Sequence, residues 1–314
     1  MRVSVLGASG YIGSFLVDRL KKKHSVISHS RKKIQNSLFK KKIYKNIYGD
    51  IKKKSVLKKI LGYKPDLIIY TISLNHFDSE KNLKFSVKNN FEPLKNLTEM
   101  IIQKNLNTKI IYFSTMQVLG REYKKKLIKE SNQKNINNFY ALTHSMCEDL
   151  LLNNSHKIDS LILRLSNAFG MPVLKNINCW WLVLNDFCRS AIIKKKIIIN
   201  SDGTALRDFI SLRKISQIVE KILKKKKFTY KIMNLCSGNT LSIKEIANIV
   251  SKNSYFKENI PVFVKKKKKK KKTNFFRYDV SRMKKIGIYE KSDLNIQIKN
   301  FLKEVNLKYT NKKI

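Results

Sequence analysis

The chain has 314 residues, which is long enough to bury a full hydrophobic core in one large domain or two modest ones. It contains no run of about eighteen apolar residues, which excludes a membrane-spanning helix of the usual kind. A glycine turn interrupts the apolar N-terminus, so this segment lacks a signal-peptide pattern, and we expect a cytoplasmic protein with no membrane partner. The four cysteines show no Cys-x-x-Cys spacing, which predicts incidental thiols and no metal site.

The formal net charge of +45 comes almost entirely from lysine and invites a nucleic-acid interpretation. However, the abundant Lys, Asn and Ile are residues that A- and T-rich codons encode, so base composition explains the excess. No nucleic-acid-binding motif interleaves aromatic residues with the lysine clusters. We therefore expect nucleic acid to bind nonspecifically at most. The clusters lie at 21–23, 40–42, 52–54, 124–126, 194–196, 224–227 and 265–272.

The first thirteen residues, MRVSVLGASGYIG, predict a buried strand, a glycine turn and the start of a helix. Gly7, Gly10 and Gly13 follow the strand at three-residue spacing. This arrangement places a pyrophosphate at a helix N-terminus, where unpaired N–H groups and the helix dipole favour an anion. The glycines allow a tight turn, a close approach to phosphate and close packing of helix on strand. The segment therefore predicts dinucleotide binding.

The residues after the second predicted strand bear on the choice of cofactor. An NAD-binding domain usually has a carboxylate here for the ribose 2′-hydroxyl, but this chain has Ser28-His29-Ser30-Arg31-Lys32. Ser30 and Arg31 suit a 2′-phosphate, which slightly favours NADP over NAD. The alternative is that Arg31 is one more solvated cation in a basic chain.

Strands and helices alternate along the first half of the chain, which predicts a parallel sheet with right-handed crossovers. Further strands are predicted at 25–28, 67–70, 109–114 and 161–165, and another that ends at 48–51. Helices are predicted at 11–21, about 82–104, and 140–152. No internal repeat is evident.

Several landmarks, in order, resemble the extended branch of the short-chain dehydrogenase/reductase superfamily, and specifically its nucleotide-sugar epimerases. The landmarks are GASGYIG, the pair Asp50-Ile51, Thr71-Ile72-Ser73, Asn90 before Asn96-Leu97, FSTMQVLG at 113–120, YALTHSMCEDLL at 140–151, LRLSNAFG at 163–170, Arg207-Asp208-Phe209, and Asn234-Leu235 through Gly238 and Ser242. The resemblance implies an α/β fold: a Rossmann-type doubly wound parallel sheet with a smaller C-terminal α/β substrate-binding domain. It divides the chain into an NAD(P)-binding domain at 1–165 and a nucleotide-sugar-binding domain at 166–314, with part of 205–240 packing on the first.

The resemblance also implies which residues form each part of the site. The catalytic residues are Thr115, Tyr140 and His144, and the substrate-binding residues are Asn167 and Arg207. The cofactor-binding residues are Gly7, Ser9, Gly10, Tyr11, Ile12, Gly13, Ser30, Arg31, Asp50, Ile51, Thr71, Ile72, Ser73, Asn90, Ser114 and Ser166. Family members often dimerise through two helices per subunit, which here correspond to 82–104 and 140–152 and imply a homodimer.

The largest departure from the family is at His144, where the family has a lysine four residues after the catalytic tyrosine. That lysine stabilises the tyrosinate and holds the nicotinamide ribose. A histidine carries only part of a positive charge near neutral pH, so the pKa of Tyr140 should be lowered less. Three hypotheses remain open: a catalytic pair with a weakened cation, a fold that binds cofactor with little or no turnover, and residues with no role in catalysis.

The residues after Thr115 bear on the reaction type. Sugar 4,6-dehydratases of this branch have an Asp-Glu pair there, whereas Met116 and Gln117 cannot transfer protons, so dehydration is disfavoured. Epimerisation through a keto-sugar, as in UDP-glucose 4-epimerase, needs no such pair and is the preferred hypothesis. An NADP-dependent nucleotide-sugar ketoreductase is the alternative, and a catalytically weak cofactor- or polyanion-binding protein is the alternative from another class.

The second half of the chain suggests contacts with the substrate. By resemblance, Arg207 binds the pyrophosphate of the nucleotide sugar, for which a guanidinium group is well suited. Asp279-Val280-Ser281-Arg282 resembles a family motif that follows a second phosphate-binding loop. In this chain that loop holds the lysines at 265–272, which either replace an arginine or form a solvated segment. Trp180 and Trp181 either line the sugar pocket or anchor the fold.

Overall fold

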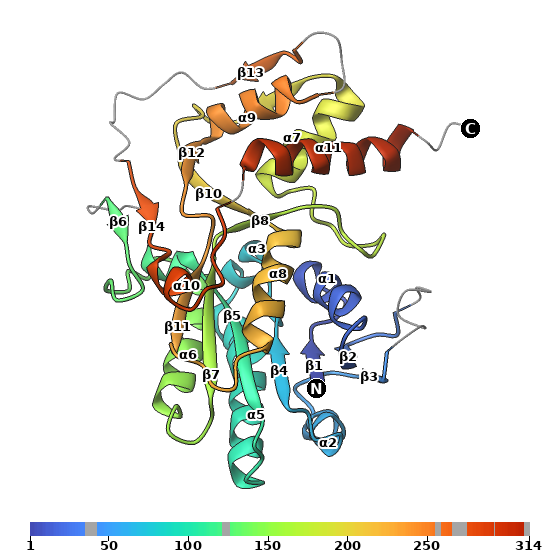
Figure 1. Cartoon of the computed structure of the whole chain (residues 1–314), viewed down its shortest axis with the longest axis vertical. Coiled ribbons are helices and arrows are strands. Elements are labelled where there is room, and N and C mark those ends of the chain that lie inside the picture. The colour runs from blue at the N-terminus through green and yellow to red at the C-terminus, as the bar shows by residue number, and fades with distance from the viewer. Residues whose placement is uncertain (35–42, 121–125, 255–258, 266–274, 292, 311–314) are drawn as a thin grey trace.

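The computed structural model describes residues 1–34, 43–120, 126–254, 259–265, 275–291 and 293–310, which form two lobes (Figure 1). The first lobe is built on a parallel sheet, as predicted; the sheet has seven strands in the order β11-β7-β5-β4-β1-β2-β3. Its strands are β1 (Arg2–Leu6), β2 (Ser25–Ser30), β3 (Lys45–Tyr48), β4 (Leu67–Tyr70), β5 (Lys109–Thr115), β7 (Ser160–Leu165) and β11 (Ile232–Leu235).

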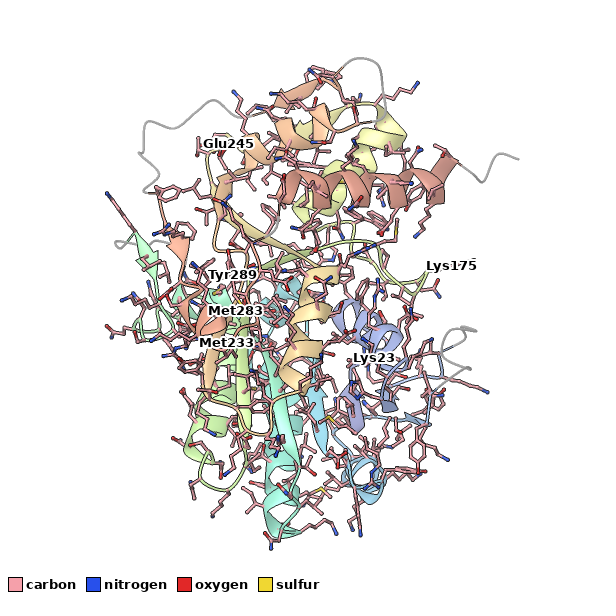
Figure 2. The ribbon with its side chains drawn as sticks, viewed as in Figure 1. Lys23, Lys175, Met233, Glu245, Met283 and Tyr289 are labelled. Carbon is pink, nitrogen blue, oxygen red and sulfur yellow. The ribbon has the colours of Figure 1, made fainter. Side chains whose placement is uncertain are left out.

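Helices cover both faces of this sheet, because nearly every residue of its central strands is apolar and buried. One face packs against α1 (Tyr11–Leu20), α8 (Leu212–Leu223) and α10 (Ser281–Lys285). The other packs against α2 (Lys54–Gly62), α5 (Glu92–Gln103) and α6 (Phe139–Asn153). Met283 of α10 and Met233 of β11 are both fully buried in the first of these two layers (Figure 2).

The second lobe is a small α/β unit at the carboxyl end of the large sheet. A three-stranded sheet, β12-β10-β8, lies at its base, and three helices pack above it (Figure 1). Its elements are β8 (Asn167–Phe169), α7 (Val183–Lys194), β10 (Leu206–Ser211), β12 (Thr240–Ser242), α9 (Ile243–Lys252) and α11 (Leu294–Thr310). Four short strands form two further sheets of two strands each. One sheet pairs β9 (Ile197–Ile199) with β13 (Val262–Val264), and the other pairs β6 (Leu127–Ile128) with β14 (Arg277–Tyr278).

The long helix predicted at 82–104 is interrupted. It consists of α4 (Leu83–Ser86), a π-helical turn (Val87–Phe91) and α5. Pro93, in the first turn of α5, has no N–H to donate, which favours a break in the regular ladder. Asn90 lies in the π turn, and π turns often occur at functional positions because they redirect a side chain.

A buried ion pair connects α6 to the neighbouring strand β7. Arg164 donates two hydrogen bonds to the carboxylate of Glu148, at 2.9 and 2.8 Å, and both side chains are almost completely buried. Burial alone would raise the pKa of Glu148. Arg164, together with Ser114 and Lys134, outweighs burial, so the pKa lies below its ordinary value of 4.5.

We expect Glu148→Gln to destabilise the fold by about 3–5 kcal/mol at pH 7, because it leaves a buried guanidinium without its counter-charge. The wild-type carboxylate has a lowered pKa, so its contribution is present above about pH 4.5 and is lost as the pH falls. Urea unfolding at pH 7 and pH 3 should therefore show a deficit that shrinks in acid. Glu99→Gln, in the exposed pair with Lys95, is the control and should cost less than about 1 kcal/mol. A Glu148→Gln deficit as small as this control would contradict the argument.

Candidate active site

The glycine turn at the end of β1 leaves an open helix N-terminus. Gly7 has φ of +90°, and a Cβ on Gly13 would lie 2.2 Å from the Gly7 carbonyl oxygen, so neither position tolerates a side chain. No side chain caps α1 at Gly10, and the first turn of α1 carries no acidic residue. The N-terminus of α1 is therefore able to accept an anion.

A cavity of about 200 Å³ lies beside this turn, across the carboxyl ends of the central strands. Ten of the predicted cofactor-binding residues line it: Gly7, Ser9, Gly10, Ser30, Arg31, Asp50, Ile51, Thr71, Ile72 and Ser73. Four lining residues were not predicted: His29, Lys52, Leu74 and Asn89. Lys52 and Leu74 directly follow predicted landmarks, so neighbourhood along the chain was the available signal.

Tyr11 and Asn90 are predicted cofactor residues whose side chains do not line this cavity. The Tyr11 hydroxyl donates to the Gly170 carbonyl at 2.7 Å and accepts from Asn185 at 3.0 Å, so it joins the two lobes. The Asn90 side chain accepts from the backbone N–H of Leu74 at 2.7 Å. It therefore holds the loop after β4, whose residues do line the cavity.

The remaining predicted cofactor residues outside the cavity lining are Ile12, Gly13, Ser114 and Ser166. Ile12 and Gly13 are in the first turn of α1. The Ser114 hydroxyl donates to Glu148 at 2.6 Å, and the Ser166 hydroxyl donates to Asp208 at 2.6 Å. Both serines thus support buried carboxylates.

The three predicted catalytic residues come together near the cavity. Thr115 is the last residue of β5, and Tyr140 is in the first turn of α6, where Asn138 caps the helix by accepting from the N–H of Ala141 at 2.7 Å. The side chains of Thr115 and Tyr140 are hydrogen-bonded to each other. The ring of His144, one helical turn after Tyr140, lies edge-to-face with it at a centroid distance of 4.6 Å.

Hydrogen bonds hold His144 in one neutral form. The Tyr112 hydroxyl lies 2.6 Å from Nδ1, the Ser73 hydroxyl oxygen lies 3.1 Å from Nε2, and the Ser73 hydroxyl donates to the Leu74 carbonyl. Because the Ser73 hydroxyl donates its one hydrogen to that carbonyl, it can only accept from His144. Nε2 is therefore assigned as the donor to Ser73, and Nδ1 as the acceptor from Tyr112. Burial lowers the pKa of His144 to about 4. At neutral pH this side chain is therefore uncharged.

Among the described residues, no cation contributes to the pKa of Tyr140. Burial raises this pKa to about 12, and the hydrogen bond with Thr115 lowers it only in part. The site therefore has the geometry of an acid/base pair but lacks the charge that stabilises a tyrosinate.

The predicted substrate residues share one face of the small sheet. Arg207 is paired with Leu241, and Asn167 with Phe209. Because Arg207 and Phe209 are two residues apart on β10, all four side chains lie on the same face.

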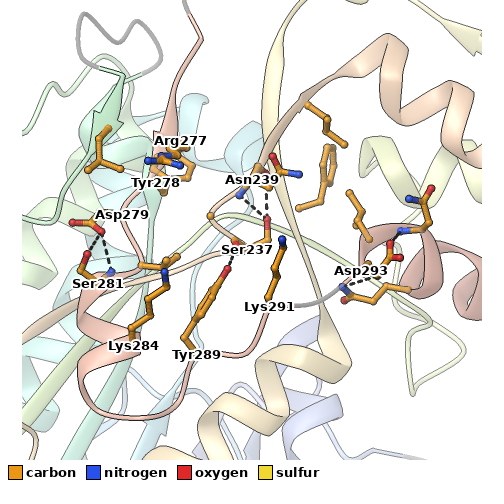
Figure 3. Close-up of a pocket in the computed structure, with 18 of the residues that line it drawn as sticks. Ser237, Asn239, Arg277, Tyr278, Asp279, Ser281, Lys284, Tyr289, Lys291 and Asp293 are labelled. Atoms are coloured by element: carbon orange, nitrogen blue, oxygen red, sulfur yellow. Dashed lines mark hydrogen bonds between the residues drawn. The ribbon is translucent and has the colours of Figure 1, made fainter.

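A groove of about 1320 Å³ is lined by Phe209 and Leu241. Three cationic side chains, Arg277, Lys284 and Lys291, and two carboxylates, Asp279 and Asp293, also line this groove (Figure 3). Asp279 accepts hydrogen bonds from Ser281, and Asp293 accepts one from the N–H of Asn295. Cations beside an apolar floor suit an anionic ligand that carries a ring.

The two predicted tryptophans have different environments. Trp180 packs against Tyr309, and the charged groups of Arg189 and Lys308 lie over its ring, so it anchors a loop to the second lobe. Trp181 is 46% exposed and contacts Phe77 of the first lobe. Trp180 therefore has the anchoring role, and a place for Trp181 in a sugar pocket stays a prediction.

The structure also bears on the sequence expectations about membranes, metals and the lysine clusters. Within the described ranges no helix is long and apolar enough to cross a membrane, and no cluster of His, Cys, Asp or Glu has a metal-binding arrangement. Lys23 and Lys175, from different lobes, both point into solvent (Figure 2). Of the lysine clusters, 40–42, 124–125 and 266–272 lie outside the described residues.

Comparison with known proteins identifies the family. Residues 3–236 match the NAD dependent epimerase/dehydratase family. Comparison with curated protein sequences gives no significant match.

Among solved structures, the chain is similar to a UDP-N-acetylglucosamine 4-epimerase from Methanobrevibacter ruminantium in complex with UDP-N-acetylmuramic acid (23% identity, 96% and 97% of the two chains covered, TM-score 0.82). It is also similar to a Thermotoga maritima UDP-glucose 4-epimerase with UDP-glucose (18%, 99% and 100%, 0.83). A third similar structure is a Bacillus cereus UDP-glucuronic acid 4-epimerase (20%, 98% and 100%, 0.79).

Proposed function

The chain belongs to the NAD-dependent epimerase/dehydratase family, and on that premise we propose that it is an NAD(P)-dependent nucleotide-sugar epimerase. The proposed reaction oxidises a sugar hydroxyl to a keto-sugar and reduces it from the other face, as in a UDP-glucose 4-epimerase. The observation that carries the proposal is the position of Ser73, which lines the cofactor cavity and hydrogen-bonds His144. This residue places the catalytic group beside the place where a nicotinamide would react.

The cavity residues fit a dinucleotide. The uncapped N-terminus of α1 suits the pyrophosphate, and Asp50 and Ile51 lie where the adenine would be held. When bound, the cofactor supplies the hydride acceptor and donor. Ser73 and His144 orient its ribose, and the Gly7 turn allows the backbone to approach it closely.

The catalytic groups divide the proton transfer between them. Tyr140 exchanges a proton with the reacting sugar hydroxyl, and Thr115 hydrogen-bonds the same oxygen. With a pKa of about 12, only about one Tyr140 side chain in 10⁵ is deprotonated at pH 7. Proton abstraction is therefore expected to limit the rate near neutral pH and to accelerate as the pH rises.

The nucleotide portion of the substrate is proposed to lie in the groove over β10 and β12. Arg207 and Asn167 are on the face that this groove covers, and Arg277, Lys284 and Lys291 supply positive charge along it. A diphosphate there would be held by electrostatic attraction, while Phe209 and Leu241 would contact the base or ribose.

Tyr140→Phe tests the proposed function. We expect it to abolish epimerisation of UDP-glucose or UDP-N-acetylglucosamine, because the phenol oxygen is the proton carrier. Cofactor affinity, measured by calorimetry, should stay within about two-fold, because the ring and its packing remain. If the wild type binds cofactor and nucleotide sugar without turnover, the chain is the noncatalytic binding protein that the sequence left as an alternative.

His144→Lys tests the consequence of the uncharged histidine. An ammonium group one turn from Tyr140 favours the tyrosinate, so the pKa of Tyr140 should fall. The basic rise in the pH profile of kcat/KM should move to lower pH by about one unit or more. The neutral variant His144→Gln is the control and should leave the position of the rise unchanged. Identical profiles for the two variants would rule out a charge effect.

Arg31→Asp tests the proposed preference for NADP. Arg31 lines the cavity at the end of β2, where a 2′-phosphate would lie, and β2 itself carries no carboxylate; Asp50, which follows β3, is the acidic residue of the lining. The substitution should weaken NADP⁺ binding by about ten-fold or more, with little loss of NAD⁺ binding. Lys33→Asp makes the same charge change at an exposed position outside the cavity lining and is the control. An equal effect of both variants would mean that general charge, not a 2′-phosphate contact, sets affinity.

A further inference from the structure

A short helix, α3 (His76–Glu80), lies against the N-terminus of α6 and fixes the position of Tyr140. The Glu80 carboxylate accepts a hydrogen bond from the backbone N–H of Tyr140 at 3.0 Å. The His76 ring lies edge-to-face with the Tyr140 ring at a centroid distance of 6.1 Å. Any side chain that α3 presents beside His76 is therefore close to the reacting end of the site.

Phe77 is that neighbouring side chain, and it contacts the other lobe. Its ring lies 5.6 Å from that of Trp181, at an interplanar angle of 74°. Phe77 is 63% exposed and Trp181 is 46% exposed, so this contact between the lobes is not part of either hydrophobic core. The Trp181 indole N–H donates to the Asn178 carbonyl at 3.0 Å, which fixes the ring on its own loop.

Two exposed rings that contact each other between the lobes offer apolar surface to a ligand, and covering that surface would gain the stability that burial provides. A pyranose ring has apolar C–H faces and polar edges, and aromatic rings are well suited to contact those faces. The pair consists of one residue from each lobe, beside the catalytic tyrosine. The His76 ring, which contacts Tyr140, also lies 5.9 Å from the Phe77 ring, so the pair continues a row of rings that starts at Tyr140.

The charges of α3 add a second constraint. Asp78 and Glu80 place two carboxylates on the helix, and Lys81 pairs with Asp78 at 2.6 Å while Glu80 is held by the α6 backbone. Lys81 balances the charge of Asp78, whereas Glu80 forms no ion pair with another described residue. A carboxylate on the sugar would therefore approach the uncompensated charge of Glu80. A neutral sugar avoids this repulsion.

We propose that Phe77 and Trp181 form an aromatic wall that receives the sugar ring and selects neutral sugars over uronic acids. This inference rests on the proposed function, because it assigns the sugar end of the same site. It also explains why the two adjacent tryptophans differ: Trp180 anchors the loop that presents Trp181.

The test is calorimetric and needs no turnover. UDP, UDP-glucose and UDP-glucuronic acid are titrated into the cofactor-loaded wild type and into Phe77→Ala and Trp181→Ala. We expect UDP-glucose to bind the wild type at least about ten-fold more tightly than UDP-glucuronic acid. Each variant should weaken UDP-glucose binding by about five- to ten-fold and leave UDP binding unchanged, because UDP lacks the sugar.

Tyr44→Ala is the matched control, because Tyr44 is 58% exposed and also forms an edge-to-face pair, with Tyr63, away from the proposed site. It should change none of the three affinities. Equal losses for UDP and UDP-glucose in the wall variants, or tight binding of UDP-glucuronic acid by the wild type, would overturn the aromatic wall alone. Failure of the wild type to bind any of the three ligands would overturn the proposed function and this inference together.

Discussion

The chemistry of this site depends on the burial that keeps His144 neutral and on the hydrogen bonds that fix its tautomer. Tyr112 donates to one ring nitrogen, and Ser73 receives the proton of the other. A second proton on the ring would need an acceptor where the Tyr112 hydroxyl now donates, in a position buried from water. The low pKa of His144 follows from this burial, and the high pKa of Tyr140 follows from its own burial with no charge beside it. His144 thus hydrogen-bonds Tyr112 and Ser73 but adds no positive charge that would lower the pKa of Tyr140.

One helix carries most of these constraints. Along α6, Tyr140 and His144 face the site, and Glu148 lies one turn further on, bound to Arg164 in β7. Ser114 donates to Glu148, while the adjacent Thr115 bonds Tyr140, so β5 is tied to α6 at two successive residues. The Ser114–Glu148 hydrogen bond therefore helps to fix β5 against α6, and with it the distance between the Thr115 and Tyr140 hydroxyls, while Arg164 ties the same carboxylate to β7.

The parts of this arrangement that the sequence predicted are local. The strand at 67–70, the glycine turn and the Thr115 and Tyr140 segments follow from apolar runs, spacing and family landmarks, and the structure contains those elements at those positions. Residues whose role depends on distant contacts were not predictable in the same way. Tyr11 lies in the glycine-turn segment, yet its hydroxyl binds Gly170, which is 159 residues away. Asn90 was assigned to the cofactor, but nothing in its neighbourhood indicated that it would hold the Leu74 backbone from inside a π turn.

The charge of the whole chain and the charge of the site are separate properties. In a chain with a net charge of +45, one would expect a cation beside Tyr140. Instead, position 144, where the sequence resemblance led us to expect a lysine, holds a histidine that burial keeps uncharged, while lysines such as Lys23 and Lys175 are exposed. A lysine at 144 would have to lose water, and the hydrogen-bonding of Tyr112 and Ser73 would have to rearrange around an ammonium group. Surface lysines keep their water and need no such rearrangement. Their number therefore gives no information about the charge beside Tyr140.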